Sequence, residues 1–225
     1  MSLTSAKLAI SDLQTALLIY LCRVEHDFFI NFGVFQTSAV ELAAVITGLV
    51  SVWLVKKENV WAFPIGGVSV LLSAYIYFRG NIYANAGINL FYFIMNIYGW
   101  YNWLRKTEGD HQLMITSCSR KEMQFYIALM IVLFLGLWYL LSRMPDHQYA
   151  VYDSFTSALY AVAMWLMARK KIQHWILWII GDVVMIALCF FLKWYFLGFQ
   201  YLVYTIIATL GWMEWKYKVK GTQTY

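Results

Sequence analysis

The stretch YGWYNW, residues 98–103, returns 112 residues later as LGWMEW, residues 210–215. Both copies share the pattern Gly-Trp-x-x-Trp, and each closes a long apolar run. Tryptophan is the largest side chain, so a chain seldom places two pairs of tryptophans at matching positions by chance. The recurrence predicts that the protein is built from two related halves.

The composition places the chain in a lipid bilayer. Of its 225 residues, 62% are hydrophobic and 13% are charged, against about 25% charged in soluble domains. A helix that crosses a membrane needs about 20 mostly apolar residues, because its backbone polar groups must be bonded within the segment. Seven stretches meet this requirement. They run approximately over residues 39–56, 60–78, 82–104, 124–142, 153–168, 173–192 and 194–216.

The first 38 residues are expected to lie at the membrane interface. The run LQTALLIYLC, residues 13–22, is too short to span the bilayer. It also lacks the basic start and the small-residue cleavage site of a signal peptide. Its apolar residues Leu13, Ala16, Leu17 and Tyr20 share one face of a helix, which predicts a helix lying in the interface.

The net charge of +5 predicts membrane orientation rather than nucleic-acid binding, because the basic residues form short clusters between apolar runs. With seven spans, twelve of the 17 Lys and Arg residues fall on the side of the C-terminus and five on the other. The positive-inside rule then places the C-terminus in the cytoplasm and the N-terminus outside.

The 112-residue shift relates the third predicted span to the seventh. The identical pairs are Tyr83/Tyr195, Leu90/Leu202, Tyr92/Tyr204, Ile94/Ile206, Gly99/Gly211, Trp100/Trp212, Trp103/Trp215 and Lys106/Lys218. The same shift pairs Glu41 with Asp153 at the start of the first span of each half. For the second spans, a shift of 115 aligns Gly66 with Gly181, which predicts three extra residues before the sixth span.

These observations predict an all-α integral membrane fold of seven transmembrane helices in a 3+1+3 order. The odd connecting helix lets both three-helix units enter the membrane from the same side, as parallel repeats about a pseudo-twofold axis along the membrane normal. The expected parts are an interfacial segment at 1–38, a first repeat at 39–106, a cytoplasmic loop and linker helix at 107–152, a second repeat at 153–218, and a cytoplasmic tail at 219–225.

Polar and aromatic side chains form one stripe on the third predicted span. Residues within about 80° of one another on its helical wheel are Asn85, Asn89, Tyr92, Asn96, Trp100 and Trp103. Three carboxamides at bilayer depth do not face lipid. The stripe therefore predicts a ligand site, with hydrogen bonding between helices as the alternative.

In the second half, Tyr204 belongs to the corresponding face of the last span, and Gln200 lies close beside it. The tryptophans of both motifs are expected to form a gate on the cytoplasmic side. They are Trp100, Trp103, Trp212 and Trp215. The alternative interpretation is a belt of aromatic anchors at headgroup depth.

Asp182 lies in the middle of the sixth span, where a charged side chain costs at least ~2.5 kcal/mol. Residues in such places are usually functional, and Trp178, four positions earlier, shares its helix face. A carboxylate hydrogen-bonded to a neighbouring helix is the alternative. The spacing of histidines, cysteines and glycines predicts no catalytic residue, no cofactor and no metal site.

Several stretches between residues 41 and 218 resemble the PnuC family of bacterial vitamin transporters. They are YGWYNW, LGWMEW, ALYAVAMWLMARKKIQHWILWIIGD and FQYLVYTIIATLGW. The resemblance implies a multi-pass protein of the bacterial inner membrane, with its N-terminus in the periplasm and a fold similar to full-length SWEET transporters. It further implies facilitated diffusion of nicotinamide riboside, an NAD precursor, by a homo-oligomer. A cytoplasmic kinase that phosphorylates the riboside is the implied functional partner.

Nicotinamide riboside combines a flat pyridinium cation, a carboxamide and a ribose. Aromatic faces attract a desolvated cation by up to ~2 kcal/mol, a carboxylate complements its charge, and carboxamides bond the amide and the hydroxyls. The expected substrate contacts are Asn89, Tyr92, Asn96, Trp178, Asp182, Gln200 and Tyr204. Thiamine or another vitamin transported by the family, a proton-coupled carrier that uses Asp182, and a membrane enzyme acting on a vitamin or a lipid headgroup are the alternatives.

Overall fold

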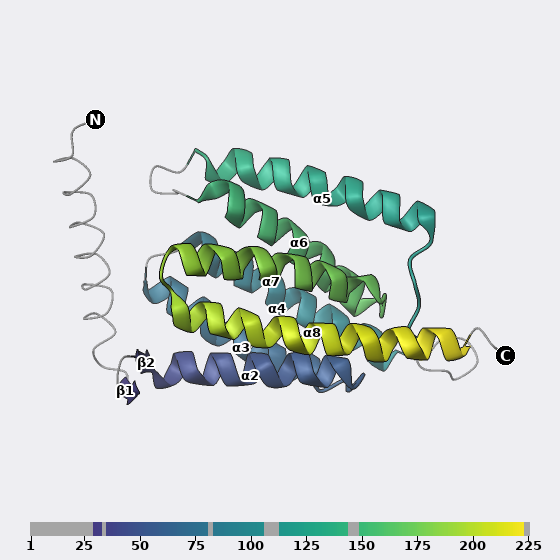
Figure 1. The fold of residues 1–225 in the computed structure, drawn as a ribbon, viewed down its shortest axis with the longest axis horizontal. Coiled ribbons are helices and arrows are strands. Elements are labelled where there is room, and N and C mark those ends of the chain that lie inside the picture. The colour runs from purple at the N-terminus through teal and green to yellow at the C-terminus, as the bar shows by residue number, and fades with distance from the viewer. Residues whose placement is uncertain (1–28, 33–34, 81–82, 106–112, 144–148, 223–225) are drawn as a thin grey trace.

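The structure, a computed structural model, describes residues 29–32, 35–80, 83–105, 113–143 and 149–222. Within them the chain forms one two-stranded antiparallel hairpin followed by seven α-helices (Figure 1). The strands are β1 (Phe29–Phe32) and β2 (Phe35–Ser38). The helices are α2 (Ala39–Lys56), α3 (Ala62–Arg79), α4 (Tyr83–Leu104), α5 (Arg120–Leu141), α6 (Ala150–Ala168), α7 (Gln173–Phe191) and α8 (Tyr195–Thr222).

The seven helices coincide with the seven predicted spans, and the differences at their ends have local causes. Helix α5 begins at Arg120 rather than 124, because Ser119 and Glu122 form a capping box that satisfies the first backbone N–H groups. Helix α8 continues to Thr222, past the expected end at 216. The β1–β2 hairpin was not predicted, and the expected interfacial helix at 13–22 lies outside the described residues.

Contacts among the described helices close a ring of six. Helix α3 packs on α2 and α4, and α7 packs on α6 and α8. Two further contacts join these sets, one between α2 and α8 and one between α4 and α6. Helix α5 packs on α6 at the edge of the bundle (Figure 1). The ring leaves one face of each of its helices directed toward a common interior.

The first and third helices of both halves run in the same direction (Figure 1). The carbonyl of Lys56, at the end of α2, accepts a hydrogen bond from the Trp215 indole of α8. The carbonyl of Met167, near the end of α6, accepts one from the Trp103 indole of α4. These contacts gather four helix ends at one end of the bundle, called here the tryptophan end. Helices α2, α4, α6 and α8 begin at the opposite end.

A single shift of 112 residues relates the two halves along their whole length, so the shift of 115 expected for the second spans is wrong. The turns before α3 and α7 have the same hydrogen bonds. The Ala62 N–H donates to the Asn59 carbonyl, as the His174 N–H donates to the Lys171 carbonyl. Because the two turns have the same length, no residue is inserted before α7, and each α7 residue is equivalent to the α3 residue 112 positions earlier.

Large apolar side chains cover the outer surface of the bundle. Val132 of α5 is 65% exposed, and Phe190 and Phe191 of α7 are 74% and 77% exposed. Apolar exposure on this scale fits a surface that faces acyl chains rather than water. Four of the described helices, α2, α3, α5 and α7, are long and apolar enough to cross a membrane by length and composition.

One close contact between helices occurs twice, at positions related by the repeat. A Cβ atom on Gly99 of α4 would collide with the ring of Phe63, and one on Gly211 of α8 would lie 2.6 Å from the ring of Trp175. Phe63 and Trp175 are equivalent residues, each 1% exposed. In both halves the glycine admits an aromatic ring from the preceding helix.

We expect Gly99→Ala to lower the melting temperature of the detergent-solubilised protein, because the added methyl group overlaps the Phe63 ring and overpacking costs about 1–3 kcal/mol. Gly136→Ala in α5 is the matched control, since a Cβ atom there meets nothing within 4 Å and alanine favours a helix over glycine. Equal melting temperatures for the two variants would contradict the packing described for Gly99.

Candidate functional site

A cavity of about 680 Å³ lies within the ring of six helices, which is in the range of small-molecule sites, roughly 300–1,000 Å³. Its walls come from all six helices of the ring, with Leu141 of α5 at one edge. It begins at the first turns of α2 and α6, where Glu41 and Asp153 lie, and reaches Tyr92 and Tyr204 in the middle of α4 and α8. The cavity therefore belongs to the half of the bundle away from the tryptophan end.

The lining combines aliphatic side chains with many polar and aromatic ones. The hydroxyl and amide side chains are Ser69, Ser73, Asn85, Asn89, Thr156, Ser157 and Gln200. The aromatic side chains are Tyr77, Tyr92, Tyr149, Tyr160, Trp194, Tyr201 and Tyr204. Flat rings beside convergent hydrogen-bonding groups fit a small polar ligand that carries an aromatic ring.

Four of the seven expected contact residues line this cavity: Asn89, Tyr92, Gln200 and Tyr204. The Asn89 amide nitrogen donates to the Asn85 carbonyl at 2.9 Å, which leaves its side-chain oxygen as an acceptor. The Gln200 amide nitrogen donates to the Tyr204 hydroxyl at 3.4 Å. Both carboxamides are thus held in place by their own helix and keep hydrogen-bonding capacity for a ligand.

Asn96 shares the stripe of Asn89 but is not among the described residues that line the cavity. Its side chain is 6% exposed, and its amide nitrogen donates to the Tyr92 carbonyl at 2.9 Å. Its oxygen lies 2.9 Å from the Cβ position of Gly66. Asn96 therefore packs between α4 and α3, one helix turn below the cavity.

Asp182 and Trp178 also lie outside the cavity lining, behind Tyr160 of α6. Asp182 is 3% exposed and accepts a hydrogen bond from the Tyr160 hydroxyl at 3.0 Å. The Trp178 ring stacks on the Tyr160 ring with centroids 4.8 Å apart and planes at 26°. The two residues hold the tyrosine that forms this part of the wall.

The cavity wall includes residues that the sequence analysis did not select. Tyr160 and Tyr201 line it, as do Glu41 and Asp153 near its opening. The repeat already pointed to the acidic pair, because the 112-residue shift relates Glu41 to Asp153. Tyr201 is equivalent to Asn89 by the same shift, so the signal that selected Asn89 also marked its partner in α8.

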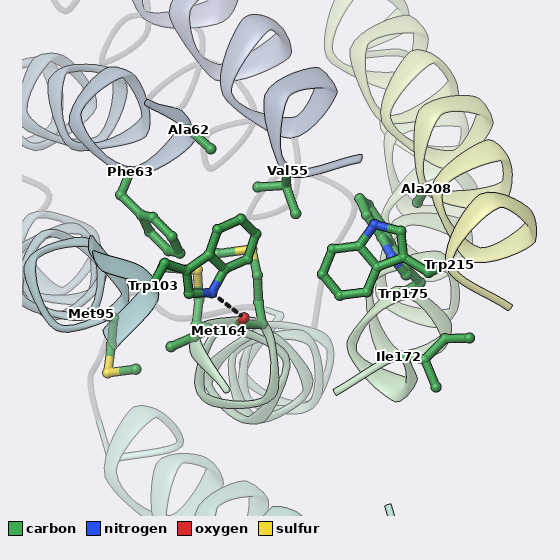
Figure 2. Close-up of a cluster of buried hydrophobic side chains, with 12 residues drawn as sticks. Val55, Ala62, Phe63, Met95, Trp103, Met164, Ile172, Trp175, Ala208 and Trp215 are labelled. Atoms are coloured by element: carbon green, nitrogen blue, oxygen red, sulfur yellow. Dashed lines mark hydrogen bonds between the residues drawn. The ribbon is translucent and has the colours of Figure 1, made fainter. Parts of the chain in front are cut away.

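The second tryptophan of each motif closes the tryptophan end through a hydrogen bond to the other half. The Trp215 indole N–H donates to the Lys56 carbonyl at 3.1 Å, and the Trp103 indole N–H donates to the Met167 carbonyl at 3.2 Å. The Lys56 carbonyl is the last of α2, where carbonyls lack partners within the helix, whereas the Met167 carbonyl also accepts the Lys170 N–H at 3.0 Å. Figure 2 shows the two indoles on either side of Val55, with ring centroids 6.2 Å apart.

The four tryptophans expected to form a gate have different surroundings. Trp103 and Trp215 are 6% and 0% exposed, and they meet 11 residues beyond Tyr92 and Tyr204, about 16 Å along their helices. Trp212 is half-buried against the same cluster, with the Lys216 ammonium 4.5 Å from its ring centroid. Trp100 is 42% exposed, as expected for an aromatic anchor at headgroup depth.

Ion pairs between the halves lie beside these indoles. Glu58 and Lys170 are equivalent by the repeat, both have positive φ, and their charged groups are 3.2 Å apart. Lys218 of α8 binds the same carboxylate at 2.8 Å, while Glu214 pairs with Lys57 at 3.4 Å. Partial burial works to raise the pKa of the Glu58 carboxyl, but the Lys218 and Lys170 ammonium groups hold that pKa below its ordinary value.

Known proteins resemble the chain over most of its length. A family model described as nicotinamide mononucleotide transporter matches residues 38–217. The nicotinamide riboside transporter PnuC of Escherichia coli (strain K12) is 28% identical over 211 residues, covering 83% of this chain and 88% of that protein. The riboflavin/roseoflavin transporter RibM of Streptomyces davaonensis is 26% identical over 180 residues, covering 78% and 83%. A crystal structure of the vitamin B3 transporter PnuC has a similar fold, with a TM-score of 0.68 at 20% identity over 98% of this chain and 93% of that one.

We expect Trp103→Phe to lower the melting temperature of the purified protein by several degrees. The substitution removes the indole donor from the buried Met167 carbonyl, which keeps only the Lys170 N–H. Loss of such a hydrogen bond costs about 0.5–1.5 kcal/mol, and about 2–4 °C is lost per kcal/mol in a chain of this size. Trp100→Phe makes the same chemical change within the same motif at an exposed position and should have little effect. A matching loss in both variants would show that the indole bond does not stabilise the closed end.

Proposed function

Because the chain belongs to the nicotinamide mononucleotide transporter family, whose model matches it from residue 38 to residue 217, we propose that it carries nicotinamide riboside across the membrane. The match confirms the resemblance to the PnuC transporters, and the chain is a membrane transporter and not an enzyme. The observation that carries the choice of substrate is the cavity, which combines aromatic, amide and acidic groups, together with the similarity to the E. coli transporter of nicotinamide riboside.

Each part of nicotinamide riboside has a chemical complement in the cavity. Tyr92 and Tyr204 offer ring faces to the pyridinium cation, and Asn89 and Gln200 offer hydrogen bonds to the carboxamide or the ribose. The carboxylates of Glu41 and Asp153 place negative charge near the opening, which favours entry of a cation.

In this proposal Trp178 and Asp182 act through Tyr160 rather than by touching the substrate. The hydrogen bond and the ring stacking described above fix the Tyr160 side chain at the cavity wall. Asn96, which packs against α3, supports the wall from below. A proton-coupled carrier that uses Asp182 is not favoured, because the carboxylate already accepts the bond that holds Tyr160.

The proposed mechanism is alternating access by two parallel three-helix repeats, 39–106 and 153–218, joined by the linker helix α5. The cavity lies between the repeats, as in transporters built from parallel repeats, and Trp103 with Trp215 closes the path beyond it. The tryptophan end is assigned to the cytoplasm, since the basic residues Lys56, Lys57 and Lys170 lie there. The N-terminus is then periplasmic.

The proposal includes the cellular setting implied by the family. The protein acts in the bacterial inner membrane as a homo-oligomer and carries its substrate by facilitated diffusion. Such a carrier only equilibrates the riboside across the membrane. Phosphorylation by a cytoplasmic kinase therefore makes uptake one-way, because the added phosphate carries negative charge that the carboxylates of the cavity repel.

A titration of the purified protein tests the substrate. Nicotinamide riboside, its 5′-phosphate, thiamine and riboflavin are each titrated by calorimetry, and uptake of the riboside into proteoliposomes is measured with and without a pH gradient. The riboside should bind most tightly, and uptake should be the same under both conditions. Tighter binding of riboflavin or thiamine would assign the cavity to that vitamin instead.

We expect Asn89→Ala and Gln200→Ala each to weaken binding of nicotinamide riboside by several-fold or more, because a polar group of the ligand left unpaired costs about 1–3 kcal/mol. Thr209→Ala is the control on α8, since the Thr209 hydroxyl donates to the carbonyl of Thr205 in its own helix at 2.8 Å. Wild-type affinity in both cavity variants would remove Asn89 and Gln200 from the binding site.

A further inference from the structure

Two buried polar atoms at the tryptophan end have no hydrogen-bond partner in the part of the chain that the structure describes: Nε2 of His174 and Nε1 of Trp175. The two side chains are 0% and 1% exposed. An unpaired polar atom at such depth destabilises a fold and calls for an explanation. That two of them come from adjacent residues points to a shared role.

The two atoms have complementary hydrogen-bonding character. Nδ1 of His174 lies 2.7 Å from the Lys171 carbonyl. A carbonyl only accepts hydrogen bonds, so Nδ1 carries the proton and Nε2 of the neutral ring is an acceptor. The indole nitrogen of Trp175 is a donor only. One donor and one acceptor thus stand on neighbouring rings, whose centroids are 4.4 Å apart.

The repeat provides an internal comparison, because the equivalent residues in the first half are Ala62 and Phe63. Phe63 packs against Gly99 and meets Trp103 edge-on, with centroids 4.8 Å apart and planes at 86°. Trp175 packs against Gly211 and meets Trp215 with planes at 87°. An alanine and a phenylalanine therefore achieve the same packing without polar atoms, so packing does not explain the imidazole or the indole N–H.

The pair lies beside the two indoles that meet at the tryptophan end. The His174 ring is 4.9 Å from the Trp215 ring, which faces Trp103 across the bundle (Figure 2). Both rings lie beside Trp215, with centroids 4.9 and 5.7 Å from its ring, so a substrate that passes between the two indoles comes close to them. The lining of the cavity ends at Tyr92 and Tyr204 on α4 and α8 and does not include either residue of the pair.

We infer that His174 and Trp175 form a release site that binds a primary carboxamide as the substrate leaves toward the cytoplasm. The carboxamide NH₂ donates to Nε2 of His174, and its carbonyl accepts from Nε1 of Trp175. This inference rests on the proposed function, because nicotinamide riboside supplies the carboxamide. It adds a second site, separate from the cavity, and it gives the unpaired atoms partners in the open state.

Two variants test the release site: Trp175→Phe, which removes only the donor, and His174→Ala/Trp175→Phe, which copies the Ala62–Phe63 pair of the first half. Trp53→Phe makes the same change on the outer surface, where Trp53 is 46% exposed, and serves as control. Each protein is assayed for binding of nicotinamide riboside, for uptake into proteoliposomes and for melting temperature. Uptake of nicotinic acid riboside, in which a carboxylate replaces the carboxamide, is measured in parallel.

Both variants should bind nicotinamide riboside within about twofold of wild type, because the cavity is unchanged, while its uptake falls at least fivefold. Their melting temperatures should stay the same or rise, since a buried unpaired polar atom is removed. The ratio of riboside to acid riboside uptake should fall toward one. Trp53→Phe should match wild type in every assay.

Wild-type uptake of nicotinamide riboside in both variants would overturn the release site and leave the proposed function intact. A lower melting temperature with unchanged uptake would assign the two atoms to the fold and would equally overturn it. If the wild-type protein neither binds nor transports the riboside, the proposed function itself fails, and this result is independent of the variants.

Discussion

The arrangement of the two halves depends on one kind of hydrogen bond. In it, an indole N–H of one half donates to a carbonyl near the end of a helix of the other half. It occurs twice, from Trp215 to Lys56 and from Trp103 to Met167. A helix that ends inside an apolar bundle must have its last carbonyls satisfied. Tryptophan offers one N–H to a buried carbonyl while its ring fills the surrounding core, which explains the second tryptophan of each motif.

The two halves have the same backbone arrangement but differ in the polar groups that they present to the cavity. Asn89 is equivalent to Tyr201, and Gln200 is equivalent to Ile88. A symmetric pair of walls would suit a symmetric ligand. At one pair of positions α4 has a carboxamide and α8 a ring, and at the other α4 has an aliphatic chain and α8 a carboxamide. Each end of an asymmetric ligand therefore meets a different partner.

The closure at the tryptophan end is reciprocal, because each half holds the helix end of the other. Glu58 and Lys170 add an ion pair between equivalent turns, and both residues have positive φ. Both indole bonds lie at the tryptophan end. Loss of one of them therefore weakens the same contact between the halves that the other stabilises. Reciprocal contacts of this kind favour two discrete arrangements, closed and open, over a graded series.

The sequence by itself determined the seven helices, the repeated motif and the family, because hydropathy and the paired motifs are local patterns. It also selected Asn89 and Tyr92 on one face of α4, and Gln200 and Tyr204 on α8, all of which line the cavity. Only the tertiary structure decided that Asn96, on the same face, packs against α3 and that Asp182 holds Tyr160. A helical wheel gives the direction in which a side chain points, but whether a cavity or a neighbouring helix lies there depends on how closely the helices approach at that depth.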